Sequence, residues 1–305
     1  MKAVIYEAYG PPNVLTLKQV EKPIPKDDEI LVKIHAATVT SGDARLRSSD
    51  FPPLFWLPAR LIFGLFKPKK KILGHELAGV VEEIGKGVTR FNVGDSVFGT
   101  TTMLSTGSYA EYICLPQKWK SGVIALKPKN LSYQEAAALP IGAMTAIYLL
   151  EKAQLKKGQN VLVYGASGSV GSYAVQIANQ KGAIVKGVCS TSNFEMLRSL
   201  GAQNLIDYKK EDYSAGDEKF DIVFDAVGKT TKSKAKKVLN PGGTFVSVKM
   251  MTKEKDETLE LIKEMAEQEK LKAFIDQHFK LEEIVKAHEY VDKGRKRGNV
   301  VIETP

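Results

Sequence analysis

The stretch Val161-Leu162-Val163-Tyr164-Gly165-Ala166-Ser167-Gly168-Ser169-Val170-Gly171 decides the fold of this chain. It begins with an apolar run rich in branched side chains, which is typical of a buried strand, and the run ends at glycine. Residues 172–178 then carry apolar side chains at helical spacing. We therefore expect three glycines on a strand-to-helix turn. Gly165 suits the tight turn, Gly168 lets the backbone approach a pyrophosphate, and Gly171 lets the helix pack closely on the strand.

Further strand-like runs follow at residues 184–189, 204–208, 221–225 and 244–248, with helical stretches or turns between them. This alternation predicts a parallel sheet of strand–helix–strand units. In such a sheet the free amides at the first helix N-terminus bind the anionic part of a dinucleotide. A glycine-rich turn in an α/β domain without a phosphate ligand is the alternative, since the glycine spacing by itself is weak evidence.

The end of the second strand-like run indicates which dinucleotide is bound. NAD-binding domains usually place Asp or Glu about 20 residues after the glycines, where the carboxylate binds the ribose 2′-hydroxyl. Cys189 stands at that place, and Ser190, Thr191 and Asn193 follow with groups that can donate to a 2′-phosphate. We therefore expect NADP(H). The same polar residues are also compatible with capping of the next helix.

Composition and charge limit the classes of protein that the chain can represent. A length of 305 residues predicts two domains. The net charge of +9 favours anionic ligands, but the basic clusters at 67–71 and 295–297 are too short to indicate nucleic-acid binding as the main role.

Cys114 and Cys189 lie in unrelated strand-like segments, which predicts no disulfide framework and a reducing compartment, the cytoplasm. The opening residues resemble a strand and not a signal peptide, and no apolar run has the length of a membrane span.

The remaining elements are predicted from periodicity and from turn residues. Strand-like segments at 2–6, 29–36, 78–84, 95–99 and 110–114 predict a β-rich domain before the glycine turn. An Ala-rich helical stretch over 133–150 is expected to be interrupted at Pro140. Amphipathic helices are expected over 258–268 and 281–291, and a last strand over 299–303.

Little chain separates the 244–248 run from the amphipathic helix that follows it. We therefore expect a parallel sheet that is shortened by one strand. An outer strand that could pair across a dimer would then be absent, so we expect a monomer, or a dimer formed through a different surface.

Several motifs together resemble one known family. The opening Met1-Lys2-Ala3-Val4, the segments 74–79 and 93–99, the glycine turn, and the closing segments 287–291 and 298–302 stand in the order seen in medium-chain dehydrogenases/reductases. Within that superfamily the chain resembles the zinc-free quinone oxidoreductase (zeta-crystallin-like) branch. The resemblance implies an α/β protein with a GroES-like β-rich catalytic domain over 1–117. It also implies a Rossmann NADP-binding domain with a doubly wound parallel sheet over 118–256, and a C-terminal segment over 257–305 that returns to the catalytic domain.

The resemblance also implies where each part of the cofactor binds. It places Thr145 near the nicotinamide and 167–170 at the pyrophosphate. Ser190 and Tyr208 fall near the adenosine end, and Gly228 and 246–249 along the nicotinamide ribose and carboxamide. Phe51 falls where an aromatic ring covers the cofactor. The glycine turn, the polar residues after Cys189 and the family resemblance together predict the following cofactor-binding residues: Phe51, Thr145, Gly165, Ser167, Gly168, Ser169, Val170, Gly171, Ser190, Thr191, Asn193, Tyr208, Gly228, Val246, Ser247 and Val248.

The segment Gly74-His75-Glu76 resembles the one that supplies a zinc ligand in the alcohol dehydrogenase branch. Catalytic zinc needs about three protein ligands. Thr40 stands where that branch has a cysteine, and no cysteine occurs near residues 139–141. We therefore expect no metal, and a hydrogen bond between His75 and Asp43 in its place.

Without a metal to polarise an alcohol, the expected reaction is hydride transfer from NADPH to a quinone or an α,β-unsaturated carbonyl acceptor. The proton that completes the reduction comes from solvent or from a side chain, and the sequence singles out no catalytic residue. The alternative is an NADPH-binding scaffold or redox sensor without turnover.

Residues 51–66 form an unusually apolar insertion, which the basic cluster 67–71 follows directly. Three interpretations stay open. The insertion is a lid over a small apolar electron acceptor, a structural loop packed on the first domain, or, together with 67–71, a peripheral membrane contact.

Overall fold

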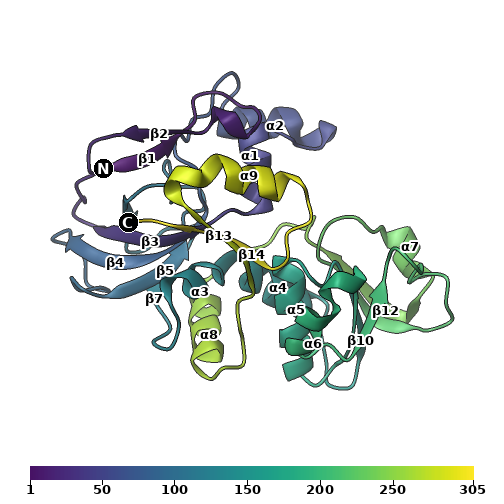
Figure 1. The fold of residues 1–305 in the computed structure, drawn as a ribbon. Coiled ribbons are helices and arrows are strands. Elements are labelled where there is room, and N and C mark those ends of the chain that lie inside the picture. Colours follow the sequence, from purple (N-terminus) through teal and green to yellow (C-terminus); the bar gives the residue numbers. More distant parts are fainter. The chain divides into compact units, whose positions relative to one another are not determined.

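The computed structural model describes residues 1–305 as two compact units, each with its own sheet (Figure 1). The first unit consists of Met1–Pro140, Lys255–Glu260 and Ile275–Pro305, and the second of Ile141–Glu254 and Leu261–Phe274. None of the helices combines the length and the apolar character that crossing a bilayer requires.

The first unit is built on a seven-stranded sheet in the order β13-β14-β3-β4-β5-β7, in which β6 also pairs with β3. Only the β13–β14 pair is parallel. The elements of this unit are β1 (Lys2–Ile5), η1 (Pro12–Val14), β2 (Thr16–Gln19), β3 (Glu29–Thr38), α1 (Ser41–Ser48), α2 (Pro53–Phe63), β4 (Glu76–Ile84), β5 (Ser96–Thr100), β6 (Tyr112–Pro116), β7 (Ile124–Leu126), α3 (Tyr133–Ala137), β13 (Ile275–Lys280), η3 (Leu281–Glu283), α9 (Ile284–Asp292) and β14 (Asn299–Glu303).

The end of the chain is part of this first sheet. Strand β14 pairs with the end of β3, where Val301 lies opposite Thr38. Helix α9 packs its apolar face on the same core, where Ile284 and Val291 are buried, and Leu281 of η3 is buried beside them. The amphipathic pattern expected over 281–291 is therefore confirmed, and burial of that face holds the C-terminal segment on the sheet.

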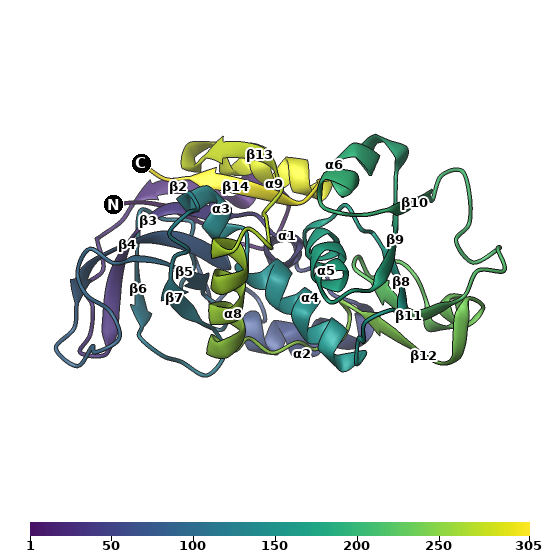
Figure 2. The same ribbon diagram turned by 90° about the horizontal axis from the view of Figure 1, so that it is seen from below.

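The second unit contains a parallel sheet of five strands in the order β10-β9-β8-β11-β12 (Figure 2). The order places β8, which precedes the glycine turn, in the middle, as in doubly wound folds. The elements are α4 (Pro140–Lys152), β8 (Asn160–Tyr164), α5 (Ser169–Gln180), β9 (Ile184–Cys189), η2 (Thr191–Asn193), α6 (Phe194–Ser199), β10 (Asn204–Asp207), β11 (Phe220–Asp225), α7 (Lys232–Lys236), β12 (Leu239–Ser247) and α8 (Asp256–Glu267), of which α4 and α8 cross the boundary between the units.

The expected shortening of the parallel sheet is confirmed. Strand β12 is its last strand on one side, and the chain reaches α8 without forming another. The interruption expected at Pro140 is also found, because α3 ends at Ala137 and α4 begins at Pro140.

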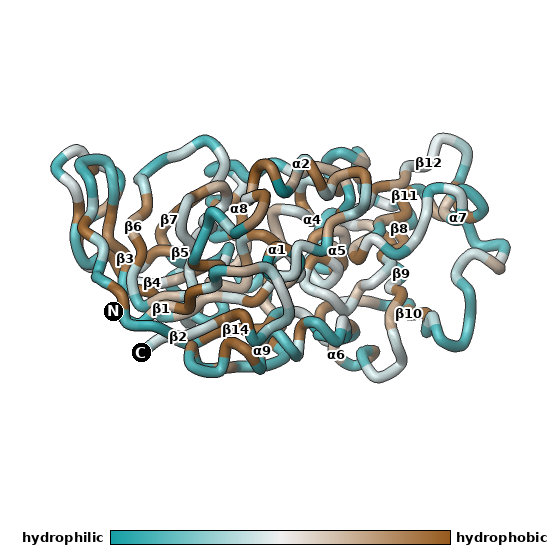
Figure 3. Tube along the Cα trace, turned by 90° about the horizontal axis from the view of Figure 1, so that it is seen from above, coloured by the Kyte–Doolittle hydropathy of each residue, from teal (hydrophilic) through white to brown (hydrophobic).

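The apolar insertion folds into the helix α2, with Pro53 in its first turn and Gly64 as its C-cap. Its trace is largely hydrophobic (Figure 3), yet none of its residues is buried. Only Ala59, Arg60 and Phe63 of this helix are half-buried, and its other residues are exposed.

A buried polar network joins α1 to α9. The guanidinium of Arg47, which is only 2% exposed, donates to the Gly10 carbonyl, to Nδ1 of His288 at 3.1 Å and to the Asp292 carboxylate at 2.7 Å. Atom Nε2 of His288 is buried and has no hydrogen-bond partner. Burial lowers the pKa of His288 to about 4, because a charged imidazole would be poorly solvated beside Arg47.

We expect the stability of the protein to fall as the pH decreases from about 6.5 to about 4. In this window the unfolded chain binds a proton at His288 while the folded chain does not, and the difference amounts to about 3 kcal/mol. Urea unfolding at several pH values measures it, with His288→Asn, which keeps an acceptor for Arg47, as the comparison. The variant should lose less stability over this range, and identical pH slopes for both proteins would contradict the assignment.

Candidate functional site

The glycine turn has the tight geometry expected from its sequence. Gly165 follows β8 with φ of 79°, in the left-handed region that glycine tolerates best. A Cβ atom added to Gly171 would lie 2.2 Å from the carbonyl oxygen of Gly165, so only glycine allows α5 to approach the strand this closely. Gly168 is the N-cap of α5 and supplies no capping side chain. The first-turn amides of α5 thus have no side-chain acceptor, which fits the pyrophosphate of a dinucleotide.

The other expected cofactor residues of the second unit gather around the same edge of the sheet. In a parallel sheet all strands end at one edge, and β8, β9, β10, β11 and β12 end at Tyr164, Cys189, Asp207, Asp225 and Ser247. The residues at or just after these ends are Ser167, Ser169, Val170, Ser190, Thr191, Asn193, Tyr208, Gly228, Val246, Ser247 and Val248. Strand topology therefore brings together residues that are up to 81 positions apart, from Ser167 to Val248.

The loop after β9 is held by hydrogen bonds to neighbouring strand ends. The Asn193 amide donates to the Ser167 hydroxyl at 2.9 Å, which links this loop to the glycine turn. Ser190 and Ser192 lie within hydrogen-bond distance of each other, with 3.1 Å between their hydroxyl oxygens. Burial raises the pKa of the Cys189 thiol to about 12, so this cysteine stays neutral at the strand end.

Asp207 is a residue of this loop region that the sequence did not suggest. Its carboxylate accepts from the hydroxyl and the amide of Thr191 and from the amide of Lys209. These hydrogen bonds, that of the Thr191 hydroxyl first, lower the pKa of Asp207. The Thr191 hydroxyl therefore donates to a carboxylate. The donors left for a phosphate are the second N–H of the Asn193 amide and one hydroxyl of the Ser190–Ser192 pair.

On the other side of β8, a buried carboxylate orders the ends of β11 and β12. Asp225 accepts from the Ser247 hydroxyl at 2.8 Å and from the amides of Val227 and Lys229. Gly228, inside this turn, has φ of 69°. The turn and the end of β12 are thereby fixed relative to each other.

Two further expected residues lie away from the strand ends. Thr145 is on α4, three residues after Gly142, and a Cβ added to Gly142 would lie 2.5 Å from the Ser169 hydroxyl oxygen. This close contact holds α4 at the N-terminus of α5. Phe51 belongs to the first unit, where its ring stacks on Phe63 with 6.1 Å between centroids.

The first unit contains the expected hydrogen bond between His75 and Asp43. Nδ1 of His75 lies 2.7 Å from the Asp43 carboxylate. This carboxylate also accepts from the Thr40 hydroxyl and amide, and Thr40 caps α1 by accepting from the Asp43 amide. Burial raises the pKa of Asp43, but the interactions with His75 and Thr40 outweigh it and hold the pKa well below its usual range.

These residues do not fit a zinc ion. Thr40, at the position of the expected cysteine ligand, is engaged as a helix cap. No three histidine, cysteine, aspartate or glutamate side chains come together in a way that could hold a metal. The zinc-free assignment therefore remains a prediction that the donor set supports.

Two half-buried lysines interact electrostatically with Asp43, and no sequence motif predicts them. Lys70 donates to the Thr101 hydroxyl at 3.1 Å, and Lys296 to the Gly298 carbonyl at 2.7 Å. Burial lowers the pKa of each to about 8. The charge of Asp43 opposes this shift at Lys70, and the charges of Glu76, Asp276 and Asp43 oppose it at Lys296. Because they come from segments far apart in sequence, only the folded chain reveals that both interact with this carboxylate.

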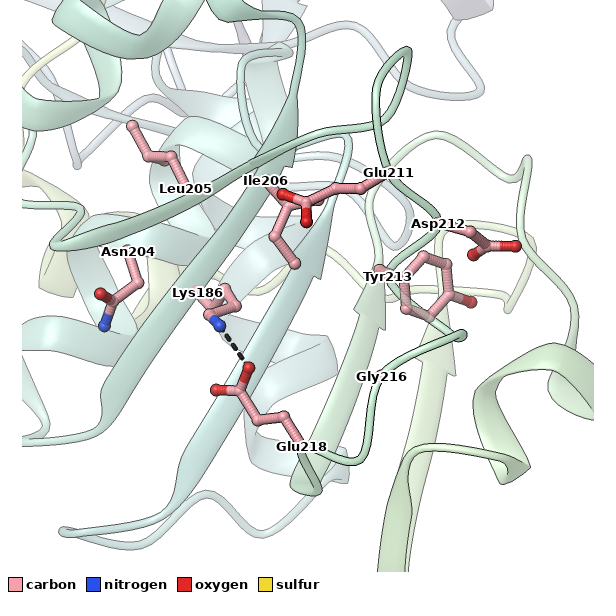
Figure 4. A pocket seen from close by; sticks show the side chains of 9 residues that line it. All are labelled: Lys186, Asn204, Leu205, Ile206, Glu211, Asp212, Tyr213, Gly216 and Glu218. Carbon is pink, nitrogen blue, oxygen red and sulfur yellow. Dashed lines mark hydrogen bonds and ion pairs between the residues drawn. The ribbon is translucent and has the colours of Figure 1, made fainter.

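A separate cavity of about 230 Å³ lies in the second unit, lined by parts of β9 and β10 and by the segment 211–218 (Figure 4). Its walls include the ion pair between Lys186 and Glu218. None of the expected cofactor residues lines it, so we do not assign it to the dinucleotide.

The turn at the strand edge and the doubly wound order define a protein of the dinucleotide-binding class. Comparison with known protein families supports this class. Residues 26–128 match the alcohol dehydrogenase GroES-like domain, and residues 169–277 match the zinc-binding dehydrogenase family. The chain belongs to the quinone oxidoreductase branch of the medium-chain dehydrogenase/reductase superfamily.

Relatives match over nearly the whole chain. The 2-methylene-furan-3-one reductase of Solanum lycopersicum is 35% identical, over 99% of this chain and 79% of the relative. The chloroplastic NADPH-dependent alkenal/one oxidoreductase of Arabidopsis thaliana is 30% identical over the same shares. The quinone oxidoreductase from Coxiella burnetii has a solved structure with a TM-score of 0.85 and 29% identity, covering 100% of this chain and 99% of that one.

We expect the purified protein to contain no stoichiometric zinc. Thr40 and Asp43 form hydrogen bonds with each other, and no set of three possible zinc ligands is present. Elemental analysis by mass spectrometry measures the metal content, and thermal unfolding with and without chelator measures its structural role. About one tightly bound zinc per chain, lost together with stability in chelator, is the result that overturns this prediction.

Proposed function

We propose that this chain is a zinc-independent oxidoreductase that transfers hydride from NADPH to a quinone or an α,β-unsaturated carbonyl acceptor. The uncapped N-terminus of α5, at the edge where five parallel strands end, is the observation that carries the proposal. The names of the relatives, which include an enone reductase and a quinone oxidoreductase, support the acceptor class.

In this proposal the cofactor, when bound, supplies the hydride, and the chain's residues bind and orient it. The first-turn amides of α5 bind the pyrophosphate, with Gly168 and Gly171 allowing close approach. Ser190, Asn193 and Tyr208 serve the adenosine end. Gly228, residues 246–248 and Thr145, all in the second unit, serve the nicotinamide end. In this division of roles, the second unit supplies these cofactor-binding residues.

The acceptor must be electron-poor, because no residue set for polarising an alcohol through a metal is present. Orientation of the two reactants is then the main contribution of the protein. The proton comes from solvent or from the group of titratable side chains around Asp43.

Turnover tests the proposal directly. NADPH oxidation is followed by absorbance with a panel of small quinones, 2-alkenals and saturated aldehydes, and NADPH binding is measured separately by fluorescence. We expect turnover of quinones or alkenals but not of saturated aldehydes. Binding of NADPH without turnover of any acceptor would instead favour the scaffold or redox-sensor role.

We also expect NADPH to be preferred over NADH, but moderately, since no acid follows β9 and the ionised Asp207 lies close by. Introducing a cation with Ser192→Arg should raise the ratio of kcat/KM for NADPH to that for NADH about tenfold, through a charge-assisted contact with the 2′-phosphate. Ser199→Arg, at the far end of α6, is the matched control for added charge. Equal kcat/KM for both cofactors in the unchanged protein, or a lead for NADH, would refute the preference.

The assembly and the compartment are further parts of the proposal. Since the parallel sheet ends at β12, we propose a monomer or a dimer built on another surface, and the unpaired Cys114 and Cys189 support the cytoplasm. Light scattering gives the molar mass. A dimer with continuous parallel sheets across its interface is the contrary result.

A further inference from the structure

Helix α2 presents an apolar face to the outside, which is the reverse of the usual pattern for a surface helix. Eight of the eighteen large hydrophobic residues that are exposed anywhere in the chain lie between positions 54 and 66. Leu54 is 82% exposed, Phe55 61% and Phe66 86%. We call this surface the α2 apolar face, and it consists of Leu54, Phe55, Trp56, Leu57, Leu61, Ile62, Leu65 and Phe66.

The opposite face fixes the helix to the first unit. The Tyr9 hydroxyl donates to the carbonyl oxygens of Phe63 and Gly64, both at 2.9 Å. The Arg60 guanidinium stacks on the Tyr9 ring at 3.9 Å and donates to the Ser49 hydroxyl at 3.1 Å. The apolar face is therefore held in a defined orientation and is not the exposed side of a loose loop.

Basic residues follow this apolar face directly along the chain. No Asp or Glu occurs between Asp50 and Glu76, and lysines stand at 67, 69, 70 and 71. Lys67 and Lys71 are exposed. Glu7, whose pKa they help to lower, already forms an ion pair with Lys18 at 3.1 Å. Lys67 and Lys71 can therefore bind an anionic partner next to the apolar surface.

We propose that the α2 apolar face and the exposed Lys67, Lys69 and Lys71 dock the protein on the surface of an anionic lipid bilayer. The apolar side chains enter the boundary between headgroups and acyl chains, and the lysines lie at the level of the phosphates. With 11 residues, α2 is about 16 Å long and lies in the interface without spanning the bilayer.

Other occupants fit these observations less well. A second copy of the chain would bring two sets of lysines together, which is electrostatically unfavourable. Protein interfaces carry about one hydrogen bond per 100–200 Å². A partner protein would find few hydrogen-bonding groups here, because Arg60 is the only charged residue from Phe51 to Phe66 and it already donates to Ser49. A small acceptor ring covers only part of a surface made by eight side chains. A bilayer needs no directional contacts.

Trp56 provides a direct probe of this docking, because it lies on α2 and the chain has only one other tryptophan, Trp119. The full chain carrying Trp119→Phe is mixed with vesicles of phosphatidylcholine alone, or with added phosphatidylglycerol. We expect a blue shift of Trp56 emission and co-flotation with the anionic vesicles, both weakened by salt. Absence of binding, or equal binding to both vesicle types, overturns the proposal.

Variants at exposed positions separate the contribution of the α2 apolar face from that of the lysines. Phe55→Ser combined with Phe66→Ser should weaken vesicle binding about tenfold or more, while Ile24→Ser, which removes an 84% exposed side chain elsewhere on the first unit, should not. Lys67→Glu with Lys71→Glu should abolish the preference for anionic vesicles, and Lys86→Glu is the matched control.

Two results would assign the surface to another occupant and thereby refute the proposal. One is a dimer in light scattering that the double serine variant dissociates. The other is a rise in KM for a water-soluble quinone in that variant, measured without vesicles, together with unchanged vesicle binding. Because vesicle binding is measured without turnover, the outcome is independent of whether the proposed reductase activity is found.

Discussion

The close packing of α5 on β8 is the constraint on which the candidate cofactor site depends. Because Gly171 has no side chain, the helix approaches the Gly165 carbonyl to a distance that any other residue would prevent. The uncapped first turn of α5 therefore lies at the edge where all five parallel strands end. The loops after the other strands are assembled around that turn, and Asn193 is bonded to it directly through Ser167.

In the first unit, one buried carboxylate has a comparable organising role. Asp43 accepts from Thr40 and His75, and it interacts with Lys70 and Lys296, which come from distant segments. Where related zinc enzymes are expected to hold a metal ligand, Thr40 caps a helix instead. The ligand position is thus used for local backbone stabilisation. The charge of Asp43 is balanced by hydrogen-bond donors and nearby lysines rather than by a metal ion.

Much of the fold could be predicted because its elements have strong local signals. The runs at 184–189 and 299–303 are apolar and β-branched, and the strands β9 and β14 have these bounds. Strand β13 was missed because its sequence, Ile-Asp-Gln-His-Phe-Lys, does not alternate between apolar and polar residues. Its pairing with β14 at the end of the sheet, and not its own pattern, makes it a strand.

The sequence by itself determined the parallel sheet, its missing strand and the glycine turn, because these depend on residue type and spacing along the chain. The bond between His75 and Asp43, which are 32 positions apart, follows from the resemblance to a known family and not from spacing. Only the tertiary structure placed Asp207 against Thr191, brought Lys296 among the charges of Glu76, Asp276 and Asp43, and turned the apolar face of α2 outward. Such contacts join segments that are distant in sequence or depend on which face of a helix packs. No local pattern specifies them, because the free energy that decides them is shared among many residues of the folded core.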